Sequence, residues 1–267
     1  MVSTVYNGEA YVDRAIPGIL AQTYDDFEFI IVDDGSQDRT PQILRELAAR
    51  DSRVRICSPG RIGAAGAYNY AVTQARGVYI ARQDFDDRSY ADRLRVQVSF
   101  LDAHPEVGVV GGAYVLVDEN RDERYLRMPP TEHSAIYAAM AKYIPLAHTV
   151  ATFRKQAWAE AGGYPEVPNL IDLRFWVRLG KLGWKFANVP DVVGEHYVHP
   201  SSFFHRSFDY GHRQRDLARV QAQAVRDLGL PRWMYLYALG RYAYAYSPTS
   251  LKRMWRRTLG RSLERDI

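Results

Sequence analysis

The N-terminal half of the chain alternates short apolar runs with stretches of helical periodicity. The apolar runs lie at residues 1–5, 27–32, 54–57 and 78–81. Runs this short are typical of buried strands. Between the first two runs, Val12, Ile16, Ile19 and Leu20 fall on one face of a helix. Strands separated by helices predict parallel βαβ units, and therefore an α/β fold with a mostly parallel central sheet flanked by helices.

Two more helices are expected between the later runs. One should begin at Thr40–Pro41, with Thr40 as the N-cap and Pro41 at the first helical position. The other is alanine-rich and passes through residues 69–75, just before the fourth apolar run. Both helices fit the crossover connections of a parallel sheet.

The segment from residue 93 to 182 is less regular. We expect helices at 93–101, 132–140, 156–161 and 172–182, strands at 107–117 and 150–153, and an exposed connection at 118–130. The last of these helices is amphipathic, with Phe175, Trp176 and Leu179 at helical spacing. Asp172 lies at its N-terminal end.

After residue 202 the chain becomes basic and aromatic. Residues 203–228 read as a basic helix, 233–246 carry aromatic side chains nearly all round, and 251–257 combine cations with apolar residues at helical spacing. Basic amphipathic helices with tryptophan and tyrosine suit a membrane interface. The same helices could instead pack on the rest of the chain with their arginines in solvent, so both interpretations stay open.

Composition narrows the class of protein. With 267 residues, 47% hydrophobic and 25% charged, the chain is long enough for one sizeable core and is not disordered. Its charge of +4 suits anionic partners without choosing among nucleotides, phospholipids and nucleic acid. A single cysteine, Cys57, excludes an internal disulfide and a cysteine metal cluster. No signal peptide or bilayer-spanning run is evident, so we expect a cytoplasmic protein, or one at the cytoplasmic face of a membrane.

Polar stretches follow three of the predicted strands. Thr4–Tyr6 follows the first strand, Asp33–Asp34 the second and Asp84–Asp87 the fourth. The carboxyl ends of parallel strands share one edge of the sheet, and ligand crevices lie there. Crowded carboxylates repel one another unless they are solvated, partly protonated or bridged by a cation. On the acidic stretch alone, a solvated turn and a cation site both remain open.

Six short motifs occur in order along residues 1–202. They are Thr4-Val5-Tyr6-Asn7-Gly8-Glu9, Gln22-Thr23-Tyr24, Val32-Asp33-Asp34-Gly35-Ser36, Asp84-Phe85-Asp86-Asp87, Gly162-Gly163-Tyr164, and Asp172 with Trp176-Val177-Arg178-Leu179. Together they resemble the motifs of family-2 inverting glycosyltransferases of the GT-A fold. The resemblance implies a Rossmann-like catalytic domain over residues 1–202, a helical extension over 203–267, and a nucleoside-diphosphate sugar as donor, with UDP the first choice. It implies no nucleic-acid partner.

The resemblance also implies which residues hold the nucleotide. The candidates are Thr4, Tyr6, Asp33, Asp34, Arg61 and Asp84. A carboxylate can accept a hydrogen bond from a uracil imide, a tyrosine ring can stack on a base, and an arginine can reach a phosphate. The structural alternatives are a helix N-cap at Asp34 or Ser36, a core tyrosine at Tyr6 and a solvated Arg61.

The stretch Asp84-Phe85-Asp86 matches the metal-binding DxD motif of the family. By this match Asp86 binds Mn²⁺ or Mg²⁺ directly, while Asp84 contacts the ribose or reaches the ion through water. His199 matches a position that approaches the metal or diphosphate in some relatives, although a surface or core histidine stays open. Asp87 is expected to support the loop and not to touch the ion.

Asp172 matches the general base, which removes the proton of the acceptor hydroxyl during one in-line displacement. A plain helix N-cap is the alternative. The family usually has a glutamate before this aspartate and a second acid two residues after it, whereas this chain has Ile171 and Arg174. These differences leave the type of acceptor open. His148 is implied to line the acceptor cleft.

The implied function is metal-assisted, inverting transfer of a sugar to a hydroxyl of a glycan or lipid-linked saccharide. A polyprenyl-phosphate sugar synthase, in which a phosphate attacks, is the enzyme alternative. The other alternative is a catalytically silent homologue that binds a nucleotide sugar or a partner, and the intact Asp84, Asp86 and Asp172 argue against it.

Overall fold

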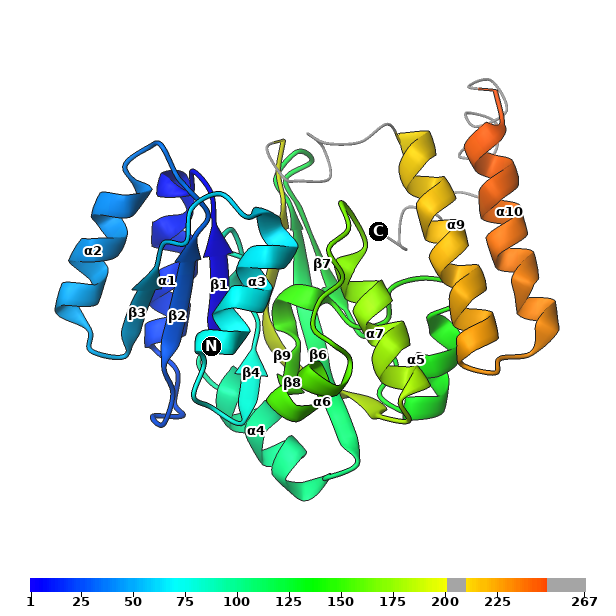
Figure 1. Cartoon of the computed structure of the whole chain (residues 1–267), viewed down its shortest axis with the longest axis horizontal. Helices are drawn as coiled ribbons and strands as arrows, with labels where there is room; N and C mark the ends of the chain where they lie inside the picture. The colour runs from blue at the N-terminus through cyan, green and yellow to red at the C-terminus, as the bar shows by residue number, and fades with distance from the viewer. Residues whose placement is uncertain (201–209, 249–267) are drawn as a thin grey trace.

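The computed structural model describes residues 1–200 and 210–248, and Figure 1 shows a sheet covered by helices with a helical pair at one end. The strands are β1 (Val2–Val5), β2 (Phe29–Asp33), β3 (Val54–Cys57), β4 (Tyr79–Ala81), β5 (Arg88–Ser89), β6 (Val107–Asp118), β7 (Glu123–Arg127), β8 (Thr152–Arg154) and β9 (Lys185–Val198). The helices are α1 (Val12–Leu20), α2 (Thr40–Arg50), α3 (Gly63–Gln74), α4 (Arg93–Ala103), α5 (His133–Ala139), α6 (Lys155–Glu160), α7 (Ile171–Lys181), α9 (Tyr210–Asp227) and α10 (Tyr235–Tyr246). Short 3₁₀ turns are η1 (Glu9–Tyr11), η2 (His148–Val150) and η3 (Arg232–Met234).

The first three strands form a parallel sheet in the order β1-β2-β3, as the sequence predicts. Val5, the last residue of β1, pairs with Asp33, the last residue of β2. A single parallel bridge from Val2 to Arg82 joins this sheet to the chain just after β4. The segments that follow β1, β2 and β4 therefore leave the strands at the same edge.

The remaining strands form a mixed sheet in the order β4-β8-β6-β9-β5, with β7 paired to β6. Only β6 and β9 run parallel among these neighbours. The expected exposed connection at 118–130 instead contains β7, and the long strand β9 was not predicted. Pro190 and Asp191 interrupt the apolar pattern of β9, and the register shift between Gly112 and Ala113 accommodates them as a bulge.

The start of α2 differs from the expectation. Arg39 occupies the N-cap, with no side-chain capping bond, and Thr40 is the first helical residue. The buried Thr40 hydroxyl accepts a hydrogen bond from the Gly8 N–H at 2.8 Å. Thr40 therefore connects the loop after β1 to α2. Its hydroxyl accepts a hydrogen bond from that loop, and not from an N–H group in the first turn of its own helix.

The largest hydrophobic core lies under α3, α7 and α9. Phe153 of β8 and Phe175 and Trp176 of α7 are fully buried in it, and each such side chain stabilises the fold by roughly 1.5–3 kcal/mol. Leu217 and Val220 of α9 belong to the same cluster. This packing fixes the position of α7 relative to the sheet.

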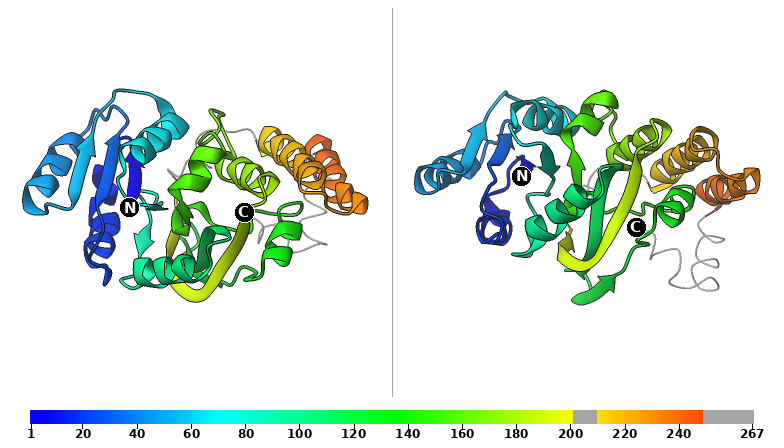
Figure 2. Two further views of the ribbon diagram at one scale, coloured as in Figure 1. Left: turned by 60° about the horizontal axis from the view of Figure 1, so that its bottom comes forward. Right: turned by 90° about the horizontal axis from the view of Figure 1, so that it is seen from below.

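The C-terminal helices α9 and α10 lie side by side at one end of the molecule (Figures 1 and 2). Asn169, before α7, donates a hydrogen bond to Asp216 of α9 at 2.8 Å. The expected helices at 203–228 and 233–246 are present where the structure describes them, whereas 203–209 and 251–257 lie outside the described residues. Within the described residues, no helix combines the length and apolar character needed to cross a bilayer.

Candidate active site

One cleft of about 1350 Å³ connects the sheet edge after β1 and β4 with the first turn of α7. Six of the site residues predicted from the sequence line it, namely Thr4, Arg61, Asp84, Asp86, His148 and Asp172. Four others do not line it, namely Tyr6, Asp33, Asp34 and His199. The fold therefore brings the acidic motif and the predicted base, which are far apart in sequence, to one cavity.

The carboxylate of Asp84 is held by Arg82. Nη1 of Arg82 donates to Oδ2 of Asp84 at 2.7 Å, and Nη2 donates to Oδ1. The Tyr68 hydroxyl donates to Oδ1 at 3.0 Å, and its ring lies 4.3 Å from the guanidinium carbon. Burial opposes the charge of Arg82, but the Asp84 carboxylate raises the pKa of this guanidinium above its usual value. Both oxygens of Asp84 are thus oriented by protein donors.

Asp86 faces His199. Oδ2 of Asp86 lies 3.0 Å from Nε2 of His199, and Nδ1 of His199 lies 3.4 Å from the Tyr11 hydroxyl. Arg14 donates to the carbonyl oxygen of Asp86 at 3.2 Å. Ligand atoms of Asp84 and Asp86, together with Asp87, lie within 4.8 Å of one another. Carboxylate oxygens suit Mg²⁺ and Mn²⁺, and an added imidazole nitrogen favours the transition metal. The residues present fit a divalent cation.

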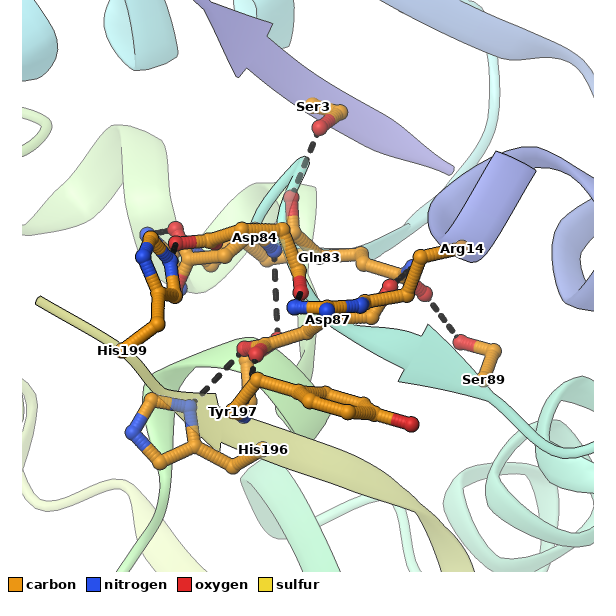
Figure 3. Close-up of polar contacts among 12 residues, drawn as sticks. Ser3, Arg14, Gln83, Asp84, Asp87, Ser89, His196, Tyr197 and His199 are labelled. Atoms are coloured by element: carbon orange, nitrogen blue, oxygen red, sulfur yellow. Dashed lines mark hydrogen bonds and ion pairs between the residues drawn. The ribbon is translucent and has the colours of Figure 1, made fainter. Parts of the chain in front are cut away.

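Asp87 has a different role from its neighbours. Its buried carboxylate accepts hydrogen bonds from the Tyr197 N–H at 2.7 Å and from Nδ1 of His196 at 2.9 Å. Figure 3 shows these contacts joining the acidic loop to the end of β9. Although burial opposes protonation, the Asp87 carboxylate raises the pKa of His196 to about 9. Asp87 therefore supports the loop, as the sequence predicts.

The carboxylate of Asp34, in the aspartate pair after β2, is engaged by groups of the chain itself. Oδ1 of Asp34 accepts the N–H groups of Ile62 at 2.6 Å and Gly63 at 3.0 Å, at the start of α3. Oδ2 forms an ion pair with Arg61 at 2.8 Å. The Arg61 guanidinium in turn lies 3.5 Å from the centre of the Tyr6 ring. The helix N-cap alternative for Asp34 is therefore wrong, because the N-cap of α2 is Arg39 and that of α3 is Ile62. The Asp34 carboxylate instead holds the loop that leads into α3.

Asp33 closes the turn after β2. Its buried carboxylate accepts the Ser36 N–H at 2.9 Å. The Ser36 hydroxyl then accepts the Asn7 N–H at 2.9 Å, which connects this turn to the loop after β1. Asp33 supports the loops around the cleft and does not line it.

Asp172 is the second residue of α7. Leu170, with a left-handed φ of 52°, is the N-cap, so Asp172 is not a helix cap. Its Oδ1 accepts the Leu173 N–H at 2.8 Å. Burial raises the pKa of Asp172 above the usual range, while this hydrogen bond and the charge of Arg82 act in the opposite direction. A carboxylate with a raised pKa in a cleft is a candidate general base.

His148 lines the cleft from η2 and is held by aromatic neighbours. Its Nε2 lies 2.9 Å from the Tyr164 hydroxyl, and its ring packs against Tyr68 and Trp176. Burial, reinforced by the charge of Arg82, lowers the pKa of His148 well below its usual value. The imidazole is therefore neutral near pH 7 and can act as a hydrogen-bonding group.

Comparison with known proteins assigns the chain to a family. Residues 1–161 match the family described as Glycosyl transferase family 2. The chain belongs to this family. It is 31% identical over 256 residues to the Bacillus subtilis (strain 168) protein named as glycosyltransferase EpsE, covering 94% of this chain and 90% of EpsE. It is also 29% identical over 196 residues to the amylovoran biosynthesis glycosyltransferase AmsE of Erwinia amylovora, covering 71% of this chain and 72% of AmsE.

Solved structures confirm the fold of this family-2 glycosyltransferase. Residues 1–349 of S. aureus TarS, in complex with UDP-GlcNAc, superpose with a TM-score of 0.70 at 17% identity, covering 98% of this chain and 76% of TarS. The mannosyltransferase PcManGT of Pyrobaculum calidifontis, in complex with GDP-Man and Mn²⁺, gives a TM-score of 0.68 at 21% identity, covering 99% of this chain and 81% of that one. The GT-A fold expected from the sequence motifs is correct.

Two positions of this glycosyltransferase were not found from the sequence as site residues. Arg82 lies directly after β4 and two residues before Asp84, and a cation ending a buried strand beside an acidic motif is a signal that could have identified it. His196 lines the cleft from β9. The hydrophobic pattern of this strand is interrupted, so the sequence does not indicate which of its two faces is buried. Arg82 could have been identified from its charge and its spacing from Asp84. The face of β9 on which His196 lies could be known only from the register of that strand.

Proposed function

We propose that this glycosyltransferase moves a sugar from a nucleoside-diphosphate sugar to a hydroxyl of a glycan or lipid-linked saccharide, with inversion. The observation that carries the proposal is that Asp172 of α7 lines the same cleft as Asp84 and Asp86. The complexes of TarS with UDP-GlcNAc and of PcManGT with GDP-Man support the class of donor.

In the proposed step, the Asp172 carboxylate takes the proton of the acceptor hydroxyl as the hydroxyl oxygen bonds to the anomeric carbon. The bond from that carbon to the diphosphate oxygen breaks, and its electron pair leaves with the nucleoside diphosphate. One displacement inverts the anomeric configuration. Because burial raises the pKa of Asp172, the carboxylate is a stronger base than a solvated one.

We propose that Asp86 and His199 hold Mn²⁺ or Mg²⁺, with Asp84 fixed beside them by Arg82. A divalent cation there would neutralise charge on the departing diphosphate. Tyr11 contacts His199, and Arg14 contacts the backbone of Asp86, so both proposed ligands are oriented by neighbouring side chains.

For the nucleotide, we propose contacts with Thr4 and Arg61 in the cleft and with the ring of Tyr6. Tyr6 is 46% exposed and is backed by the Arg61 guanidinium, which leaves a ring surface on which a base can stack. We take UDP as the first choice of donor nucleotide, since the solved structures of TarS include complexes with UDP-GlcNAc and with UDP.

We also propose that the C-terminal helices contact the cytoplasmic face of a membrane. Trp233 of η3 and Leu236, Leu239 and Tyr246 of α10 are each more than half exposed. Apolar and aromatic side chains of this kind bury at a lipid interface, and the basic residues nearby would favour anionic lipids. We also propose that the catalytic domain ends at residue 202 and that a helical extension follows. Helix α9 of this extension packs in the same hydrophobic core as α7.

The decisive experiment incubates the protein with a panel of nucleotide sugars, Mn²⁺ or Mg²⁺, and candidate glycan acceptors. Release of nucleoside diphosphate identifies the donor, and NMR of the product determines the linkage and its anomeric configuration. We expect the configuration to be inverted relative to the donor. Retention would contradict the mechanism, and a complete absence of both transfer and donor hydrolysis would favour the silent homologue.

A further inference from the structure

The wall of the cleft formed by β7, β6 and β9 carries donors that the proposed mechanism does not use. Tyr114 of β6 pairs with Arg127 of β7, and Leu116, two residues further on, pairs with His196 of β9. Side chains on one face of a sheet recur at every second residue. Tyr114, Arg127 and His196 therefore share a face, and all three line the cleft.

Arg127 is a half-buried cation whose charge is not matched locally. Across residues 1–200 and 210–248, no carboxylate forms an ion pair with it, and its guanidinium lies 5.5 Å from the centre of the Tyr125 ring. On the opposite face of the same strand, Arg124 forms an ion pair with the buried Glu195. On β7, therefore, Arg124 points away from the cleft and has a carboxylate partner. Arg127 lines the cleft and has no carboxylate partner among the described residues.

Tyr114 and His196 add further hydrogen-bond donors next to Arg127. Their rings meet edge-on with centroids 6.4 Å apart. Nδ1 of His196 is bound to Asp87 at 2.9 Å, which fixes the direction of the ring. In the described part of the chain, neither the Tyr114 hydroxyl nor Nε2 of His196 has a hydrogen-bond partner.

The carboxylates of the cleft come from other elements. Among the described residues that line it, the acids are Asp84, Asp86, Glu166 and Asp172, and none belongs to β6, β7 or β9. Arg213 of α9 lines the cleft as well. The wall formed by β6, β7 and β9 therefore presents Arg127 together with N–H and O–H donors, while Asp87, the carboxylate bonded to His196, is already engaged by Nδ1 of His196 and by the Tyr197 N–H.

We infer that this wall is an acceptor subsite for an anionic group, a phosphate or a carboxylate, with Arg127 as the charged contact and Tyr114 and His196 as further donors. A guanidinium pairs with either group through two parallel hydrogen bonds. The inference rests on the proposed function, because it assumes that the donor occupies the region of Thr4 and Arg61 and that the acceptor approaches Asp172 from the other side.

The test measures binding to the full chain saturated with UDP and Mn²⁺, so that the donor region is filled. Methyl glucoside, methyl glucuronide and methyl glucoside 6-phosphate are titrated separately by calorimetry. We expect at least one anionic glycoside to bind about tenfold more tightly than the neutral one, as a charge-assisted hydrogen bond allows. Arg127→Gln should remove that preference, and Arg127→Lys should keep part of it.

The matched control is Arg95→Gln, which removes one exposed cation of α4 that is paired with Asp92. This variant should keep the full preference. A preference for the glucuronide indicates an acidic sugar, and one for the phosphate indicates a phosphorylated acceptor. Equal binding of all three glycosides, or an unchanged preference in Arg127→Gln, overturns the inference. Failure of UDP and Mn²⁺ to bind would contradict the proposed function itself, and the inference with it.

Discussion

Arg82 and Asp84 form a two-point contact in the floor of the cleft, with Nη1 to Oδ2 at 2.7 Å and Nη2 to Oδ1. Only 4% of Arg82 is exposed, and its Nε has no hydrogen-bond partner among the described residues. A buried arginine whose N–H group lacks a hydrogen-bond partner lowers the stability of the fold. We therefore interpret Arg82 as a residue that serves the active site.

Arg82→Met should therefore lower kcat/KM by roughly 10–100-fold, the range for losing a charged hydrogen bond. Arg82→Lys should retain part of the activity, because it keeps the charge and loses the two-point geometry. Since Arg82 lowers the pKa of Asp172, Arg82→Met should also move the acid limb of the pH–rate profile to higher pH. Unchanged pH dependence would mean that the arginine only supports the fold.

Asp172→Asn should reduce kcat with a hydroxyl acceptor by roughly 10²–10⁴-fold, because it removes the general base. The base must be deprotonated, so kcat/KM of the wild type should fall as pH drops through the raised pKa of Asp172. A matched control is Asp191→Asn, an exposed carboxylate of β9. If a polyprenyl phosphate is the acceptor, it is already ionised, and Asp172→Asn should then cost far less.

Asp86→Asn should weaken Mn²⁺ binding at least about tenfold, which can be measured by the electron paramagnetic resonance of free Mn²⁺ without any turnover. Asp87→Asn should leave Mn²⁺ binding nearly intact, because Asp87 is committed to His196 and Tyr197. Equal losses in the two variants would show that Asp87 is also a ligand.

The ion pair of His196 with Asp87 should make stability depend on pH. The pKa of His196 is raised in the folded state to about 9, so its contribution is complete below the unfolded pKa of about 6.5 and is lost as pH rises through 9. The difference in unfolding free energy between wild type and Asp87→Asn should therefore shrink between pH 7 and pH 10. Urea denaturation at several pH values measures it, and a constant difference would contradict the ion pair.

The exposed apolar residues of α10 should bind anionic vesicles. Leu236→Glu combined with Leu239→Glu should reduce sedimentation with phosphatidylglycerol vesicles, because it places two carboxylates at the proposed interface. Leu182→Glu, which alters an exposed leucine after α7, is the control. Equal sedimentation of wild type and the double variant would argue against contact through this helix.

Much of the fold could be predicted from local patterns. The parallel strands β1, β2 and β3 and the helix α7 were correctly expected, because short β-branched runs and helical periodicity are local signals. Strand β9 was missed because Pro190 and Asp191 interrupt its pattern, and the bulge that tolerates them exists only through pairing with β6. Strand β7 was missed because its side chains are mostly exposed on an edge.

The sequence by itself determined the family and the chemistry of the acidic motif and of Asp172, since these depend on residue types at fixed local spacing. Only the tertiary structure decided how those groups are used. Asp34 supports α3, Asp87 holds β9, and Arg82 orients Asp84. The physical reason is that a carboxylate's role depends on which donors reach its oxygens, and those donors come from segments that only the folded chain brings together.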